Sequence, residues 1–370
     1  MKAKKLLSLV GFLAFIALMS CSKDDTKPKP TASFTASKTN VLVGEEIQFT
    51  NTSANATSYS WSFGDGTTST EASPKKTYTA TGVFTVTCVA NGAGGTNSST
   101  LDITVTAASI YFMDSSDEIM GKLTLDGSGT VATVKDLAGM SGVGIAYDTV
   151  HSKIYFSDFY DADTPNGKIW RMNLDGTGLD SIARGILDPY GIALDIAGGK
   201  VYWADDNGNI SRANLDGSSP EIGLVHIDTA GFRCVALDLK HSKMYFFDAA
   251  NDKLYVANLD GTGVTPLIEG IYGYAIYVDT ENDKIYYDEE YTPALMRANL
   301  DGSGVVQIYK NNDAAVGKSR IYGITIDYAS NKLYWSCRDA GEIYRANLDG
   351  TGKETLKTGL TSPRGIFLKK

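Results

Sequence analysis

The chain has 370 residues, of which 43% are hydrophobic and 21% charged, and its formal net charge is -9. This acidic balance repels phosphates, so it argues against any nucleic-acid partner. Besides Cys21, the cysteines are Cys88, Cys234 and Cys337, an odd number without close spacing, which excludes a disulfide framework and a cysteine-rich zinc site.

The N-terminus predicts a secretory signal. Three lysines precede an apolar run from Leu6 to Met19, which is too short to span a bilayer comfortably. Residues 18–21 read LMSC and resemble the lipobox of bacterial lipoproteins. The resemblance implies that residues 1–21 hold a signal peptide and lipobox, with cleavage before Cys21 and lipidation of its thiol. The alternative is an ordinary signal peptide with a chance cysteine.

Residues 22–30 are polar and contain proline, so we expect a tether to the membrane. Their first residues, SKDD, resemble the acidic surface-export signal of some Gram-negative lipoproteins. This implies an outer membrane lipoprotein that is exposed at the cell surface. The alternative is a lipoprotein that faces the periplasm.

Residues 31–107 predict a first domain of short strands. The stretches VGEEIQFTNTS, YSWSFGDG and GVFTVTCVANG alternate with period two between turn residues, and no useful helical period occurs. About 75 residues of this kind are typical of a β-sandwich. Cys88 alternates with Phe84 and Val86, so we expect it in the core.

Residues 61–90 of this domain closely resemble the PKD family. The residues that carry the resemblance are Trp61, Phe63, Gly64, Asp65, Gly66 and Tyr78. It implies an immunoglobulin-like sandwich with Trp61 and Phe63 as core anchors. We favour a spacer role for this domain, and the alternative is a sugar- or protein-binding module.

The remaining residues, 108–370, repeat one unit six times. An apolar-Tyr-aromatic core recurs every 41 to 48 residues, from IYFMD at 110 to LYWSC at 333, and an LDG turn follows each copy. A second motif, such as GIALD at 191–195, precedes every core except the first. Four short strands in about 45 residues are typical of a propeller blade.

The repeat closely resembles the YWTD family, the class B repeat of low-density lipoprotein receptors, which implies a six-bladed β-propeller. The fold class is therefore all-β. The first blade lacks its GIA-type strand, whereas the chain ends with a spare copy, RGIFL at 364–368. We expect this C-terminal strand to pair beside residues 110–114 and close the ring, since an open ring would expose edge strands.

The family resemblance also implies a structural carboxylate that accepts backbone N–H groups between neighbouring blades. It maps onto Asp114, Asp158, Asp205 and Asp248. Glu289 and Cys337 replace it in the last two blades. Because Cys337 is a poor acceptor, we expect a weaker junction at that blade.

The sequence gives little support for a catalytic site or a metal-binding site. The three histidines are scattered, so no Ser/His/Asp set and no His-rich metal cluster can be argued. The acidic stretch at 158–167 fails the EF-hand pattern, because Pro165 occupies a ligand position and the bidentate Glu is missing. Nucleotide-binding glycine motifs are absent. We therefore expect no metal and no cofactor.

The repeats differ most in two sets of loops, which propellers place on one face. One set enters the innermost strand of each blade, and the other joins the second and third strands. Aromatic rings and arginines anchor peptides and sugars. The predicted ligand-binding residues on this face are Tyr160, Tyr190, Phe232, Arg233, Tyr272, Tyr291, Arg320, Tyr322 and Arg364. The second set also supplies Asp161, Asp206 and Glu290. The alternative is that these rings only plug the channel.

The sequence thus favours a non-enzymatic, lipid-anchored binding protein whose propeller recognises a protein or carbohydrate ligand. One alternative is an enzyme of the lactonase or lyase type found among other six-bladed propellers. Such enzymes usually need a metal or a histidine at the pore. Another is a structural component of an outer-membrane uptake or adhesion complex.

Overall fold

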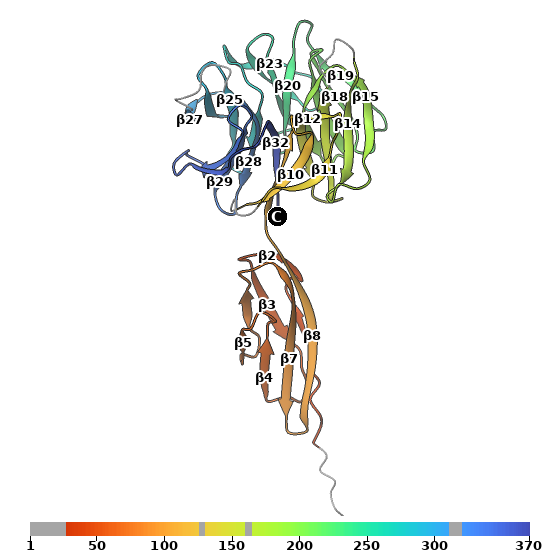
Figure 1. The fold of residues 1–370 in the computed structure, drawn as a ribbon, viewed down its shortest axis with the longest axis vertical. Helices are drawn as coiled ribbons and strands as arrows, with labels where there is room; N and C mark the ends of the chain where they lie inside the picture. The colour runs from red at the N-terminus through yellow and green to blue at the C-terminus, as the bar shows by residue number, and fades with distance from the viewer. Residues whose placement is uncertain (1–26, 126–129, 160–164, 311–319) are drawn as a thin grey trace, which may run out of the picture. The chain divides into compact units, whose positions relative to one another are not determined.

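The computed structural model describes residues 27–125, 130–159, 165–310 and 320–370. Within these residues the elements are all β-strands, and no helix has the length and apolar character to cross a membrane. The chain divides into two compact units between Thr106 and Ala107 (Figure 1). The predicted all-β class is thus confirmed. The predicted signal peptide and Cys21 lie outside the described residues.

The N-terminal unit contains two β-sheets, with a core drawn from both. The first sheet has the order β1 (Phe34–Ala36), β3 (Glu46–Asn51), β6 (Lys75–Thr77). The second has the order β2 (Asn40–Leu42), β8 (Gly95–Thr106), β7 (Gly82–Gly92), β4 (Ser58–Ser62), β5 (Thr68–Ser69).

The core of this unit contains the residues expected from the sequence. Trp61, Phe63 and Cys88 are all buried. The hydroxyl of buried Tyr78 donates to the carbonyl of Phe63 at 2.8 Å. Asp65 pairs with Lys76 at 2.6 Å. Partial burial acts to raise the pKa of Asp65, but hydrogen bonds from Lys76 and Thr67 lower it to about 2.

The C-terminal unit consists of six four-stranded antiparallel sheets, the blades of a propeller. Blade 1 contains β32 (Pro363–Lys369), β9 (Ser109–Asp114), β10 (Ile119–Thr124) and β11 (Ala132–Asp136). Blades 2 and 3 contain β12 (Ser141–Asp148), β13 (Lys153–Phe159), β14 (Gly167–Asn173) and β15 (Asp180–Ile186), then β16 (Pro189–Asp195), β17 (Lys200–Asp205), β18 (Asn209–Asn214) and β19 (Glu221–His226). Blades 4 and 5 contain β20 (Phe232–Asp238), β21 (Lys243–Asp248), β22 (Lys253–Asn258) and β23 (Thr265–Glu269), then β24 (Ile276–Asp279), β25 (Lys284–Glu289), β26 (Ala294–Asn299) and β27 (Val306–Lys310). Blade 6 contains β28 (Ile321–Asp327), β29 (Lys332–Cys337), β30 (Glu342–Asn347) and β31 (Glu354–Lys357).

The ring closes through the C-terminal strand, as predicted. Strand β32 pairs antiparallel with β9, with Ile366 opposite Phe112 and Phe367 opposite Tyr111. In Figure 1 the dark blue β32 accordingly lies among the yellow strands at the start of the propeller. β32 also packs against the inner strands of both neighbouring blades, β28 and β12. The first blade is therefore built from both ends of this unit.

Small residues allow the six inner strands to converge around the channel. The positions concerned are Gly144, Gly191, Cys234, Ala275, Gly323 and Gly365. A Cβ atom on Gly144 would lie 2.3 Å from the carbonyl oxygen of Tyr190, and one on Gly323 would lie 2.5 Å from the amide nitrogen of Ile366. At these glycine positions even the Cβ atom of an alanine would force the inner strands apart.

The repeated NLDG turns join the third and fourth strands of the blades. In blade 4 the amide of Gly261, at φ 84°, donates to the carbonyl of Asn258. Lys243 donates to the side chain of Asn258 at 2.6 Å, and blades 3, 5 and 6 repeat this bond. These turns lie at the opposite end of the blade from the start of the inner strand, so they are part of the scaffold.

Candidate ligand-binding face

One residue of each inner-strand segment lies at the same end of the central channel, directly before the small residue of that segment. We call this set the channel mouth. It consists of Val143, Tyr190, Arg233, Tyr274, Tyr322 and Arg364. The loops between the second and third strands end at the same face, because Pro189 pairs with Asp205 and Pro363 with Asp114.

Register shifts mark this part of the inner strands. The pairing with the second strand is interrupted between Pro189 and Ile192, between Phe232 and Cys234, and at the matching places of blades 1, 2 and 6. Bulges of this kind redirect a side chain and often occur beside binding sites. The sequence therefore builds the mouth on local irregularities of otherwise regular strands.

The prediction that Phe232 lies on the ligand-binding face is wrong. Phe232 is fully buried, and its ring packs 4.9 Å from that of Phe246 in the core. Successive side chains of a strand point to opposite sides. Phe232 is thus turned into the blade, whereas Arg233 reaches the channel.

Arg233 is fixed at the mouth by two contacts. Its guanidinium lies 4.1 Å from the centre of the Tyr190 ring, and its Nη1 donates to Asp206 at 2.6 Å. Tyr190 is only 8% exposed, and its ring also packs against that of Phe159, with ring centres 5.1 Å apart. One face of the Tyr190 ring is therefore already covered by Arg233.

Blades 5 and 6 contribute a chain of tyrosines. The Tyr272 and Tyr274 hydroxyls lie 2.6 Å apart, and the rings of Tyr274 and Tyr322 are 4.7 Å apart. Tyr291 contacts the Tyr272 ring and donates to Asp252 at 2.9 Å. It is 49% exposed, so it forms the outer rim of this cluster. Tyr274 was missed from the sequence, although it precedes Ala275 as Tyr322 precedes Gly323.

Three arginines surround Tyr322. The guanidinium carbons of Arg364 and Arg338 lie 5.0 and 6.0 Å from the centre of its ring. Arg320 forms a two-pronged ion pair with Asp339, at 2.6 and 3.0 Å. Arg338 and Asp339 follow Cys337 in the turn between β29 and β30, and neither was predicted from the sequence.

Tyrosines of opposite blades have raised pKa values at the channel mouth. Burial raises the pKa of Tyr190, Arg233 opposes this rise, and the nearby Tyr322 adds to it. Tyr190 belongs to blade 3 and Tyr322 to blade 6, which are opposite one another in a ring of six. Burial likewise raises the pKa of Tyr322 to about 12. Both hydroxyls are therefore protonated at neutral pH and can donate hydrogen bonds.

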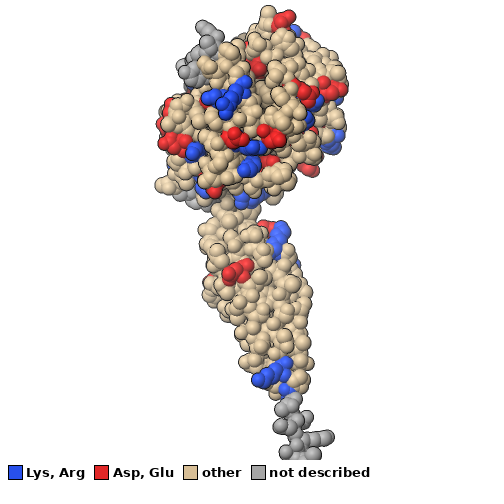
Figure 2. Space-filling model, turned by 90° about the vertical axis from the view of Figure 1, so that its right-hand side faces the viewer, with Lys and Arg blue, Asp and Glu red and all other residues tan. Residues whose placement is uncertain are grey.

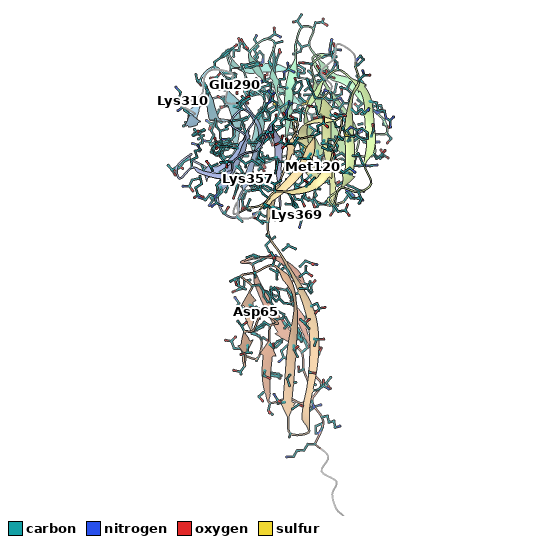
Figure 3. The ribbon with its side chains drawn as sticks, in the orientation of Figure 1. Asp65, Met120, Glu290, Lys310, Lys357 and Lys369 are labelled. Atoms are coloured by element: carbon teal, nitrogen blue, oxygen red, sulfur yellow. The ribbon has the colours of Figure 1, made fainter. Side chains whose placement is uncertain are left out.

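Two buried carboxyls lie beside this cluster. Glu290, labelled in Figure 3, follows β25 and is 1% exposed. Burial, with help from Asp339 and against Arg320, raises its pKa to about 7. Asp288 accepts the amides of Tyr274 and Ala275 at 2.7 Å, and burial raises its pKa well above the usual range. Burial thus disfavours the charged form of both carboxyls on this flank, while the arginines keep their charge.

Below the mouth, the inner strands of all six blades enclose a cavity of about 80 Å³. Arg233, Tyr274, Tyr322 and Gly365 line its upper part, and strand residues such as Ile324 line the rest. The cavity has room for several water molecules or for one small side chain.

The predicted structural carboxylates Asp114, Asp158, Asp205 and Asp248 are all buried. Asp114 accepts the amides of Thr361 and Ser362 at 2.9 Å, in the connection that enters blade 1. Asp248 likewise accepts the amide of Gly231 in the connection from blade 3 to blade 4, as expected for a carboxylate between neighbouring blades. Asp158 and Asp205 instead accept amides of their own blades, from Ser141 and Asn209. A carboxylate at the end of the second strand can reach the start of the inner strand of the same sheet, because the two strands lie side by side.

In the last two blades, other carboxylates accept the backbone amides that lead into the inner strand. Asp288 holds the incoming amides of blade 5, while Glu289 accepts the amides of Tyr291 and Thr292 in its own turn. In blade 6, Asp339 accepts the Arg320 amide at 3.0 Å. The expected weakness at Cys337 is therefore offset by a carboxylate two residues later.

The three histidines all lie in or beside turns. His151 and His241 bond to Asp148 and Asp238 at 2.7 Å in equivalent turns at the NLDG end, and His226 contacts Asn209. Among the described residues, no group of three or more His, Cys, Asp or Glu side chains is placed to hold a metal ion. Tyr160, predicted for the ligand-binding face, lies outside the described residues, as does Asp161.

Comparisons with known proteins match the two units separately. A PKD domain family model matches residues 27–107. "Low-density lipoprotein receptor-related protein 1" of Pyricularia oryzae is 32% identical over 115 residues, which cover 28% of this chain and 37% of that protein. The vitellogenin receptor of Solenopsis invicta is 31% identical over 121 residues, covering 32% of this chain and 6% of that protein. The chain thus spans well under two thirds of these relatives.

Among solved structures, a nidogen/laminin complex contains a similar chain, with a TM-score of 0.60 and 19% identity. The match covers 70% of this chain and 98% of the other. A putative TolB from Agrobacterium tumefaciens has a TM-score of 0.52 and 13% identity, covering 70% of this chain and 91% of that one. These likenesses establish the propeller fold, and the sequence matches support the resemblance to low-density lipoprotein receptor repeats.

Proposed function

We propose that this chain is a non-catalytic binding protein whose propeller recognises a protein or carbohydrate ligand at the channel mouth. The observation that carries the proposal is the convergence of tyrosines and arginines from blades 1, 3, 4, 5 and 6 at one end of the channel. Such residues dominate binding energy at protein interfaces. The opposite end carries the repeated hairpins of the scaffold.

The relatives support this proposal. Two of them are receptors or receptor-related proteins by name, and the nidogen structure is a complex with laminin. Ligand binding by this chain is an extension from those proteins, since a shared fold alone does not define a function.

We further propose that Cys21 carries a lipid that anchors the protein in the outer membrane of a Gram-negative bacterium, with the propeller at the cell surface. The PKD unit then acts as a spacer. Figure 2 supports the spacer, because the face of this unit shown there carries few charged residues. Cys21→Ser should move the protein from the membrane to the soluble fraction, and protease added to intact cells should degrade the wild-type propeller.

An array of glycans and proteins, probed with the purified protein, tests the proposed binding. We expect at least one ligand to bind and to remain bound after a chelator is added. A complete lack of binding would contradict the proposal, and binding that a chelator abolishes would contradict the expected absence of a metal.

A second candidate is an enzyme of the lactonase or lyase type, and one observation favours it. Glu290 has a pKa of about 7 beside the mouth, which suits an acid or base in proton transfer. Turnover of a lactone that disappears in Glu290→Gln would support the enzyme. Ligand binding without turnover, unchanged in Glu290→Gln, would support the binding protein.

A further inference from the structure

The Arg364 guanidinium is a buried charge without a counterion in the part of the chain that the structure describes. Arg364 is only 8% exposed, and its Nε has no hydrogen-bond partner. No ion pair or hydrogen bond links its guanidinium to another described residue, and its recorded contact is the face of Tyr322. The two other arginines of the face differ, since Arg233 pairs with Asp206 and Arg320 with Asp339.

A guanidinium keeps its proton at any physiological pH. Burying such a charge without an opposite charge costs free energy. Burial lowers the pKa of Arg364, Tyr322 opposes this shift, and Arg338 adds to it. Arg338 therefore increases the positive potential around Arg364, and an anion from outside the chain would relieve it.

The position of Arg364 makes it accessible to a ligand that enters the mouth. Tyr322 and Gly365, which contact or follow it, both line the cavity. Its guanidinium lies 5.0 Å from the centre of the Tyr322 ring of blade 6, and the guanidinium of Arg338 lies 6.0 Å from the same ring. The Arg364 side chain of blade 1 thus reaches the neighbouring blade 6 at the channel mouth.

Arg338 is a second positive charge at the same ring. Its Nε donates to the Ser362 hydroxyl at 3.3 Å, and it forms no ion pair with a described residue. The nearby carboxyls cannot fully compensate, because Asp339 is already paired with Arg320 and Glu290 has its pKa raised to about 7. The mouth thus has two arginines available to one acidic group.

The shape of the site favours a peptide side chain over a sugar ring. Sugars stack on exposed aromatic faces. Here Arg233 covers Tyr190, and the Tyr322 ring is flanked by Arg338 and Arg364. The cavity of about 80 Å³ has the size for a small group such as a carboxymethyl. The fork of a guanidinium matches the two oxygens of a carboxylate.

We propose that the channel mouth captures a peptide segment by one Asp or Glu side chain, whose carboxylate pairs with Arg364. The inference rests on the proposed binding function and specifies its ligand as an acidic segment of a protein. The exposed rim at Tyr291 would contact the residues that flank the acidic one.

Isothermal titration with short defined peptides tests this proposal. The probe is an acetylated and amidated Gly-Gly-Asp-Gly-Gly peptide, and the matched peptide has Asn in place of Asp. Glucuronate and inorganic phosphate are titrated in parallel as other anions. In the same samples, the NMR signal of the Arg364 Nε–H group, assigned with Arg364→Lys, reports contact directly.

We expect the Asp peptide to bind about tenfold or more tightly than the Asn peptide and to shift the Arg364 signal. Arg364→Gln should lose the preference for Asp. Arg184→Gln should keep it, because Arg184 lies exposed on the outer strand β15, where it bonds to Ser181. The comparison of the two peptides on the wild-type protein remains decisive even if Arg364→Gln fails to fold.

Equal affinity for the Asp and Asn peptides, or no binding of either, would overturn the proposal. Binding of glucuronate or phosphate in place of the Asp peptide would overturn it as well, and would point to a different anion. An array ligand that binds wild type and Arg364→Gln equally would overturn this inference while leaving the proposed binding function intact. An array without any ligand would instead count against the binding function itself.

Discussion

Removal of the Phe367 ring tests the closure of the propeller by its last strand. Phe367 is 7% exposed, and its ring stacks 4.8 Å from Tyr111 of blade 1 and 5.0 Å from Tyr147 of blade 2. Truncation of a buried Phe to Ala costs roughly 3–5 kcal/mol. For a unit of this size, such a loss lowers the melting temperature by roughly 6 to 20 °C.

Differential scanning calorimetry of Phe367→Ala measures this loss, provided that the propeller and the PKD unit melt in separable transitions. The control is Tyr291→Ala, which removes a ring that is 49% exposed in the same unit and should cost less than about 1 kcal/mol. The reasoning would be refuted if the two variants melted at the same temperature. In that case β32 would contribute little to the ring in solution.

Two further predictions concern buried carboxyls. Asp114→Ala leaves the buried amide of Ser362 and the partly buried amide of Thr361 without this acceptor. The loss should destabilise the propeller by roughly 1–3 kcal/mol. Asp117→Ala, at an exposed residue that bonds the Thr361 hydroxyl, should have a small effect, and equal effects of the two variants in denaturant titrations would contradict this prediction. Because Glu290 has its pKa raised to about 7, it favours folding fully below its unfolded pKa, and this contribution is lost as the pH rises through about 7. The propeller should therefore be more stable at about pH 6 than at about pH 8, and Glu290→Gln should reduce the difference; an unchanged pH dependence would show that Glu290 is not its source.

The sequence predicts the propeller well because each blade is a local unit that repeats. The Tyr-aromatic strands, the NLDG hairpins and the spare C-terminal strand each have one place in a closed ring. Second strands such as β29 are buried on both sides, since each blade packs against its neighbours. Their continuous apolar character is visible in the sequence alone.

The candidate site could be predicted only in part. The loops whose sequences differ most between the repeats were correctly predicted to lie at one face of the propeller. They could not show that a bulge turns Arg233 toward the channel while Phe232 enters the core, because that depends on the pairing register. Tyr274 could have been found by aligning the small residues of the inner strands. The pairing of Arg320 with Asp339, which leaves Arg364 without a counterion, required the three-dimensional structure.

The affinity of an array ligand for Tyr322→Ala tests the central claim most directly. Tyr322 contacts Tyr274, Arg338 and Arg364 at the channel mouth. The control is Lys240→Ala, at an exposed lysine in the turn between β20 and β21, at the opposite end of the blades. We predict that Tyr322→Ala weakens binding about tenfold or more and that Lys240→Ala leaves it unchanged. Unchanged binding by Tyr322→Ala, with the variant still folded by calorimetry, would contradict the assignment of the ligand-binding face.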